Sequence, residues 1–157
     1  MYCALINQKL RYGLICWATA SKFLIDKINV MHNKVVRYLT FSKPCSRAWP
    51  LYCKLKILPL NILKEIEWGK MMYKYQNNML PKAFDLYFRK PRHNHATRYA
   101  KQMNFEKIRA SNAKDESQMK YIGPKKWANI PLKIKEIPFL KSFINSYREH
   151  LIENYIK

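Results

Sequence analysis

The sequence predicts an all-α protein with five to six helices in a compact bundle. Only three glycines occur in the 157 residues, and the Asn-Gly and Asp-Gly dipeptides that close tight β-hairpins are absent. In several stretches apolar side chains recur every three or four residues, which is the spacing of one helix face. A chain of this length can build one hydrophobic core, so one packed unit is expected.

Two helices are predicted before residue 40. The first is expected from Tyr2 to Trp17, with a core face of Ile6, Leu10, Leu14 and Trp17. The second begins near Ser21, whose hydroxyl can cap a helix. Its predicted core stripe comprises Leu24, Ile28, Met31, Val35 and Tyr38 or Leu39. Lys27, Lys34 and Arg37 fall off this stripe and are therefore expected at the surface.

Prolines divide the next part of the chain. The stretch from Ser42 to Pro50 is expected to connect helices, and residues 51–58 to form one or two turns that Pro59 ends. A longer helix restarts near Asn61, with a predicted face of Ile62, Ile66, Gly69 and Tyr73. Gly69 would let another helix approach closely. Pro81 is well placed as the first residue of a short helix over residues 81–88.

The periodicity fades after residue 88. Residues 89–120 are expected to form a long basic and polar loop, partly disordered. Residues 121–131 are expected to form an irregular Gly/Pro/Trp loop, which Tyr121 and Trp127 pin onto the helices. Pro138 then opens a final helix with a face of Leu140, Phe143 or Ile144, Tyr147, Leu151 and Tyr155. The predicted regions are 1–88, 89–120 and 121–157, packed as one unit.

The charge of the chain points to a polyanionic partner. Thirty Lys and Arg against ten Asp and Glu give a net charge of +20, and the excess is present in every third of the sequence. Nucleic acid fits best, because each phosphate that a basic side chain neutralises releases counterions; an anionic membrane surface is the lesser interpretation. No stretch approaches the ~20 apolar residues of a membrane span. In a signal peptide the positive charges precede the apolar residues, whereas at the start of this chain they follow them. We expect an intracellular protein, nuclear or cytoplasmic.

Features of catalytic sites are not visible in the sequence. The only adjacent carboxylates are Asp115 and Glu116, in the most polar stretch, and no glycine-rich phosphate loop occurs. Neither enzymatic activity nor a cofactor is expected from this chain alone. The four cysteines, Cys3, Cys16, Cys45 and Cys53, are expected to be reduced and mostly packed thiols.

The stretch RKPRHNHATRYAK, Arg89 to Lys101, is the most basic in the chain and allows three interpretations. The histidines could hydrogen-bond the backbone and fix a loop, or the cations could bind phosphates while Tyr99 and the histidines stack on bases. Zinc binding by His93 and His95 with Cys45 and Cys53 is the outsider, because the cysteines lack the usual close spacing. The candidate nucleic-acid-binding residues are Arg89, Lys90, Arg92, His93, His95, Arg98, Tyr99, Lys101, Lys125 and Lys126.

Five motifs occur in an order that resembles a known family. They are INQKLRYGLICWATA at 6–20, INVMHNKVVRYLT at 28–40, LYCKLKILPLNILKEIEWGKMMYKYQNNMLP at 51–81, HNHATR at 93–98 and YIGPKKWANIPLKIKEIPFLKSF at 121–143. This order is similar to the region downstream of the palm in reverse transcriptases of jockey-type non-LTR retrotransposons. The resemblance covers nearly the whole chain. In two places the chain departs from the family, with Ala18 where glycine is common and Ala128 where asparagine is usual.

The resemblance implies a function for the two ends of the chain. The first motifs would form the helical thumb and the later ones a C-terminal extension, while the fingers, the palm and its catalytic aspartates are missing. A thumb holds the template and primer through backbone phosphates. The chain therefore looks like a C-terminal fragment that binds RNA or DNA nonspecifically, without polymerase activity alone. The alternative is a structural fragment that packs on a polymerase body or another partner protein.

Overall fold

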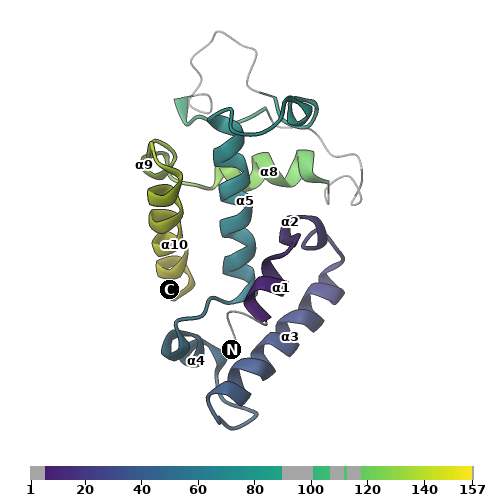
Figure 1. Cartoon of the computed structure of the whole chain (residues 1–157), viewed down its shortest axis with the longest axis vertical. Coiled ribbons are helices and arrows are strands. Elements are labelled where there is room, and N and C mark those ends of the chain that lie inside the picture. The colour runs from purple at the N-terminus through teal and green to yellow at the C-terminus, as the bar shows by residue number, and fades with distance from the viewer. Residues whose placement is uncertain (1–5, 90–100, 107–111, 113–117, 157) are drawn as a thin grey trace. The chain divides into compact units, whose positions relative to one another are not determined.

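A computed structural model describes residues 6–89, 101–106, 112 and 118–156, and every regular element among them is helical (Figure 1). No strand occurs in this described part, which confirms the all-α prediction. The elements are α1 (Gln8–Arg11), α2 (Leu14–Trp17), α3 (Lys22–Leu39), α4 (Ala48–Leu55), α5 (Leu60–Gln76), the 3-10 helix η2 (Lys82–Leu86), α8 (Met119–Ala128), α9 (Leu132–Lys135) and α10 (Leu140–Ile156). None of these helices is long and apolar enough to cross a membrane.

The chain divides into two compact units, Met1–Lys64 (unit 1) and Glu65–Lys157 (unit 2). The division falls inside α5, not at the predicted region boundaries after residues 88 and 120. The charge is shared, because unit 1 has 11 Lys and Arg against one Asp, and unit 2 has 19 against nine Asp and Glu. Each unit therefore carries a net charge of +10.

The start of unit 1 corrects the prediction of one helix from Tyr2 to Trp17. Tyr2 lies outside the described residues, and the rest forms two short helices, α1 and α2, separated at Tyr12 and Gly13. Gly13 has a φ of 60°, a left-handed conformation that glycine adopts without steric cost and that ends a helix. The break lets Leu14 and Ala18 pack with Leu60 and Leu63 in the core of unit 1.

The buried face of α3 also differs from the predicted stripe. Ile25, His32 and Val36 are its buried residues, whereas Leu24, Met31 and Tyr38 are exposed. The predicted stripe, which holds only apolar residues, does not include His32. In the structure the hydroxyl of Tyr52 on α4 lies 3.1 Å from Nδ1 of His32. Because that hydroxyl gives the imidazole a hydrogen-bond partner, a histidine can occupy the inner face. The prediction of a helix starting after Ser21 is confirmed.

The connector between α3 and α4 is shorter than predicted. The fourth helix begins at Ala48, so Pro50 lies in its first turn, where the missing amide hydrogen has little cost. It ends at Leu55, before Pro59, because Lys56 adopts a left-handed conformation with a φ of 55°. This position of α4 places Tyr52 against α3, where its hydroxyl donates to Asn33 Oδ1 at 2.8 Å.

The core of unit 2 is aromatic. The Tyr73 and Phe143 ring centroids lie 4.4 Å apart, and those of Phe143 and Trp127 lie 6.0 Å apart. Gly69 of α5 faces Tyr147 of α10, which confirms that this glycine allows a close approach. The predicted face of α5 is buried as expected, and the final helix follows Pro138.

Two predictions for this half of the chain were wrong. Residues 121–131 are not an irregular loop, because α8 covers Met119–Ala128 with Pro124 inside it. Gly123, Pro124 and Trp127 are all buried there, so tertiary packing outweighs the cost of a proline in a helix, about 3 kcal/mol. The short helix after Pro81 is a 3-10 helix, and Pro81 precedes it.

Candidate nucleic-acid interface

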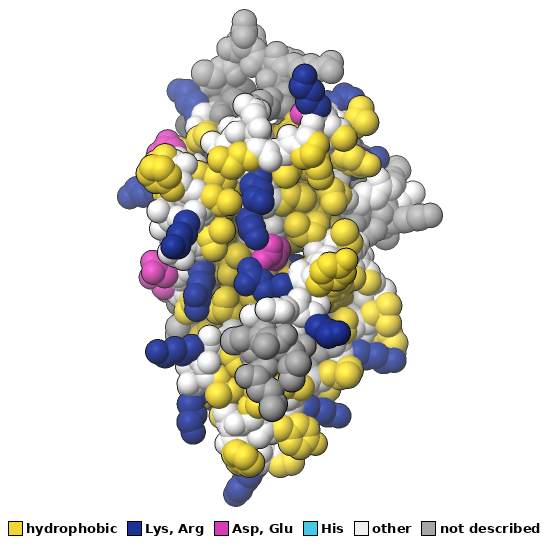
Figure 2. Space-filling view, in the orientation of Figure 1, with side chains coloured by type: hydrophobic (Ala, Val, Ile, Leu, Met, Phe, Trp, Pro, Cys, Tyr) yellow, Lys and Arg dark blue, Asp and Glu magenta, His cyan; other side chains and the backbone are white. Residues whose placement is uncertain are grey.

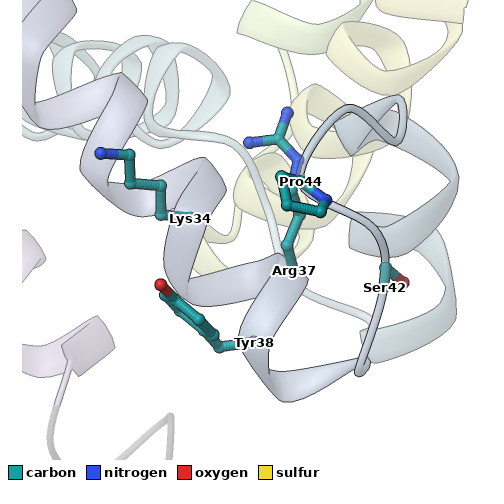
Figure 3. Close-up of a pocket in the computed structure, with 5 residues that line it drawn as sticks. All are labelled: Lys34, Arg37, Tyr38, Ser42 and Pro44. Carbon is teal, nitrogen blue, oxygen red and sulfur yellow. The ribbon is translucent and has the colours of Figure 1, made fainter.

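A hollow in unit 1 lies where α3 ends and the loop to α4 begins. It has a volume of about 190 Å³ and is lined by Lys34, Arg37, Tyr38, Ser42 and Pro44 (Figure 3). The first three come from one turn of α3, since residues three and four apart share a helix face. Figure 3 shows the Lys34 amine and the Tyr38 hydroxyl on the same side of α3, with the Arg37 guanidinium next to Pro44.

Hydrogen bonds hold the loop against the last turn of α3. The Ser42 amide donates to the carbonyl oxygen of Arg37 at 3.0 Å, and the Thr40 hydroxyl donates to that of Val36 at 3.0 Å. The Arg37 Nε donates to the carbonyl oxygen of Ser46 at 3.1 Å, which ties the middle of the loop to the helix. The side chains around the hollow therefore rise from a backbone that is already fixed, so little order has to be gained on binding.

The hollow is electropositive. Among the described residues no carboxylate lies within ion-pair distance of Lys34 or Arg37, and Lys43 and Arg47 are exposed in the same loop. The C-terminal end of a helix carries about half a negative charge, which opposes anion binding. Here the terminal carbonyls of α3 accept the hydrogen bonds of Ser42 and Thr40, and two cations outweigh the remaining partial charge.

Two exposed aromatic rings lie at this end of α3, that of Tyr38, which lines the hollow, and that of Phe41 in the loop that follows. The Tyr38 side chain is 78% exposed, and that of Phe41 is 99% exposed. The Phe41 backbone has a φ of 51°, and its amide donates to the Tyr38 carbonyl oxygen at 3.2 Å. The left-handed turn keeps Phe41 at the tip of the loop, away from the core of unit 1.

The size of the hollow limits what it can hold. Pockets that enclose a drug-sized ligand usually measure about 300 to 1,000 Å³, and this hollow of about 190 Å³ lies below that range. It can take one phosphate group or the edge of one ring. Binding here would be contact with part of a larger polyanion.

The residues predicted as the binding site are only partly described. Arg89, Lys101 and Lys125 are exposed, and the Lys125 Nζ lies 5.5 Å from the centroid of the Tyr121 ring. Lys126 forms an ion pair with Glu65 of α5, so less of its positive charge is available to attract an anionic ligand. The Glu106 amide donates to the Arg89 carbonyl oxygen at 2.9 Å. Lys90, Arg92, His93, His95, Arg98 and Tyr99 lie outside the described residues.

Lys34, Arg37 and Tyr38 were not among the predicted site residues. Their spacing in KVVRYLTFSKP places two cations and a tyrosine in one helical turn, followed by Lys43, and this pattern indicates a candidate anion-binding surface. It was missed because Tyr38 had been assigned to the core stripe of α3. Side chains on this face of the chain show the same mixture, with Lys and Arg scattered among apolar groups and few carboxylates (Figure 2).

Two buried polar side chains have perturbed pKa values. Burial lowers the pKa of Lys135 to about 8, although its Nζ donates to Asn104 Oδ1 at 2.7 Å and to the Gln102 carbonyl oxygen at 3.1 Å. Burial lowers the pKa of His32 to about 4. Because each lies in a packed core with its own hydrogen-bond partners, both groups are structural.

The described residues contain no cluster of three His, Cys, Asp or Glu that could hold a metal ion. Cys16, Cys45 and Cys53 are free thiols as expected, but they are exposed, so the prediction of packed thiols was wrong for them. Each is on a short helix or in a loop of unit 1 and lies outside the core cluster of Leu14, Ala18, Leu60 and Leu63. Cys3 and the histidines of the zinc interpretation lie outside the described part.

No family model, curated protein or solved structure matches the chain.

Proposed function

We propose that this protein binds nucleic acid nonspecifically through backbone phosphates and catalyses no reaction by itself. The observation that carries the proposal is the charge of unit 1, with 11 Lys and Arg against one Asp, together with the electropositive hollow at the end of α3. A folded domain needs a net charge of only about 2 to 8 for solubility. An excess beyond that favours a polyanionic partner.

The order of the five motifs supports a more specific proposal. The chain would be the thumb and downstream extension of a retrotransposon reverse transcriptase, acting inside the cell on RNA or DNA. Exposed cations spread over both units suit a phosphate backbone, because backbone contacts position a nucleic acid without reading its bases. Without palm carboxylates, such a fragment can hold a strand and cannot extend it.

A salt titration of duplex DNA binding tests the proposal. If about five phosphates are neutralised, log K falls with log salt at a slope near −4.5, which weakens binding several-hundred-fold between about 50 and 200 mM salt. Fluorescence anisotropy of a labelled duplex measures this directly. A flat salt response would contradict phosphate binding.

Two groups of substitutions locate the footprint. Changing Lys34, Arg37 and Lys43 to Gln should reduce the slope by about 2, since Lys34 and Arg37 lie close enough to share one phosphate, Lys43 can contact a second, and each phosphate contributes about 0.9. The matched control changes the exposed Lys133, Lys141 and Arg148 of unit 2 to Gln and alters the net charge equally. Equal effects of both groups would assign the binding to overall charge instead of the hollow. A third variant, with Arg89, Lys90, Arg92, Arg98 and Lys101 changed to Ala, tests the basic segment in the same assay.

One observation favours the structural alternative. The outer face of α3 exposes Phe23, Leu24, Val30, Met31 and Tyr38, which could pack on a polymerase body or another protein. In that case the isolated chain should melt without cooperativity, because part of its core would be missing. Circular dichroism with thermal melting checks this, and a sharp transition would argue that the chain folds independently of a partner.

A further inference from the structure

We propose that the hollow at the end of α3 is a subsite for single-stranded nucleic acid, with a phosphate at Lys34 and Arg37 and a base stacked on Tyr38. This inference rests on the proposed function and names the form of nucleic acid that the site takes. The chemistry is common to single-stranded RNA and DNA.

The cations are arranged for one phosphate group. Lys34 and Arg37 are three residues apart in a helix, so their side chains rise on the same face, and Pro44 and Ser42 also line the hollow. The Nε of Arg37 is fixed by its hydrogen bond to Ser46, which leaves the terminal end of the planar guanidinium directed away from the helix backbone (Figure 3). A guanidinium held this way, together with a flexible amine, suits phosphate oxygens.

The ring of Tyr38 is available for stacking. Tyr52 and Tyr73 are 3% and 0% exposed, as core tyrosines are, whereas Tyr38 is 78% exposed on the turn that carries the two cations. Phe41 adds a second exposed ring three residues further along the chain. Exposed rings beside backbone-binding cations are the pattern by which proteins hold single strands without sequence preference.

The arrangement favours a single strand over a duplex. In a duplex the faces of the bases are already stacked on one another, so the helix offers only its phosphates to Lys34 and Arg37. A single strand can turn one base out and place it on Tyr38 while a neighbouring phosphate stays in the hollow. The hollow of about 190 Å³ has room for that phosphate, and the exposed ring of Tyr38 beside it offers a face for the base.

The test compares single strands with a duplex for the full chain. The probes are labelled oligodeoxythymidylate, oligouridylate and a DNA duplex of equal strand length, and the variants are Tyr38→Leu, Tyr38→Phe and Tyr12→Leu. Tyr12 is the matched control, because it is an equally exposed tyrosine of unit 1, at 86%, that does not line the hollow. We expect Tyr38→Leu to weaken binding of the single strands about tenfold and to leave duplex binding nearly unchanged. Tyr38→Phe keeps the ring and should keep the affinity, as should Tyr12→Leu.

The outcomes separate this inference from the proposed function. Tyr38→Leu behaving like Tyr12→Leu, or weakening the duplex as much as the single strands, would overturn the subsite while salt-dependent binding still supports the proposed function. Binding of none of the probes by the native chain would overturn both. A loss on only one of the two single strands would support the subsite and assign it to that kind of strand, since the two probes differ in the sugar and in the methyl group of thymine. The helical circular dichroism signal should not change in any variant, because both tyrosine side chains lie in solvent.

Discussion

Gly69 lies at the closest approach of α5 and α10. A Cβ at this position would lie 2.5 Å from Cε1 of Tyr147 and 3.4 Å from Cδ1 of Ile130. Two effects oppose each other in Gly69→Ala. The alanine favours the helix by about 1 kcal/mol, whereas forcing a methyl group into a packed core costs about 1 to 3 kcal/mol. Since Tyr147 is itself buried, its ring cannot swing into solvent, and we expect the steric cost to prevail.

The first prediction is therefore a lower free energy of unfolding for Gly69→Ala, by about 1 to 2 kcal/mol, measured by urea denaturation. Combining it with Tyr147→Leu should recover part of the loss, because the clashing ring atoms are removed. The double-mutant cycle gives the coupling between the two positions. An increase in stability by the helix-propensity amount would show that the helices do not pack this closely.

His32 makes stability depend on pH. Burial lowers its pKa in the folded protein to about 4, against about 6.5 in the unfolded chain. The unfolded state therefore binds the proton more readily. The contribution of the neutral His32 to the free energy of unfolding is fully present above pH 6.5 and is lost as the pH falls through about 4. Tyr52 of α4, whose hydroxyl lies 3.1 Å from Nδ1 of His32, and Asn33, the next residue of α3, carry no charge at these pH values.

For the native chain we predict a loss of up to about 3 kcal/mol from this group between pH 7 and pH 4. His32→Gln keeps a neutral polar side chain and removes the titration. Its free energy of unfolding should therefore fall less than that of the native chain over the same range. Urea denaturation at both pH values measures the difference, and parallel losses in the two proteins would place the acid sensitivity in other groups.

At the scale of elements, residues 101–106 are fastened to α8 and α9 by polar contacts. The Trp127 indole donates to the Met103 carbonyl oxygen at 2.8 Å, and Lys135 donates to Gln102 and Asn104. The Lys135 Nζ also lies 5.3 Å from the centroid of the Trp127 ring. One buried amine therefore donates to the side-chain oxygen of the buried Asn104 and to the carbonyl oxygen of Gln102.

Lys135→Met should lower the free energy of unfolding by about 1 to 3 kcal/mol, because methionine fills the space and leaves those oxygens unsatisfied. In this variant, amide hydrogen exchange at residues 101–106 should become faster than in the native chain, by a larger factor than exchange in α5. Lys133→Met is the matched control, since Lys133 is exposed on the same short helix. Equal effects of the two substitutions would mean that the polar contacts of Lys135 contribute nothing.

Periodicity predicted the elements whose apolar face is regular and buried. The face of α5 and the start of α3 were predicted because each local pattern agrees with its packing. The inner face of α3 was not, since His32 becomes buried only when Tyr52 of α4 supplies its partner. Helix α8 was missed because glycine and proline signal a turn locally, and only the contacts of Gly123 and Trp127 in the core of unit 2 explain the helix.

The candidate site was harder to predict than the fold. An excess of cations is visible in composition, but the place where they gather depends on which face of α3 is buried. The predicted core stripe of α3 includes Tyr38, so the predicted site falls instead on the segment with the highest local charge, Arg89 to Lys101. The hollow exists because the loop turns back on α3 through hydrogen bonds of Thr40 and Ser42. No sequence motif predicts this arrangement.

At the scale of the whole molecule, positive charge should oppose folding. Each unit carries a net charge of +10, and the ion pairs of the described residues include Lys126 with Glu65 and Lys70 with Glu67. Folding brings these cations together, so self-repulsion lowers stability when the charges are not screened. Salt shortens the range of that repulsion, from about 30 Å at 0.01 M to about 8 Å at 0.15 M.

We therefore predict that the midpoint of thermal unfolding rises by several degrees when sodium chloride is increased over this range, while nucleic-acid binding weakens. The two effects have opposite signs because salt screens repulsion within the protein and attraction to phosphates alike. Circular dichroism melts at each salt concentration measure the first effect. The control changes Lys133, Lys141 and Arg148 to Glu, which cuts the net charge of unit 2 by more than half and should reduce the dependence on salt. A midpoint that stays constant or falls with salt would show that the cations are spaced too widely to repel one another. Repulsion between them would then not lower the stability of the folded chain, and a bound polyanion could not raise it by neutralising them.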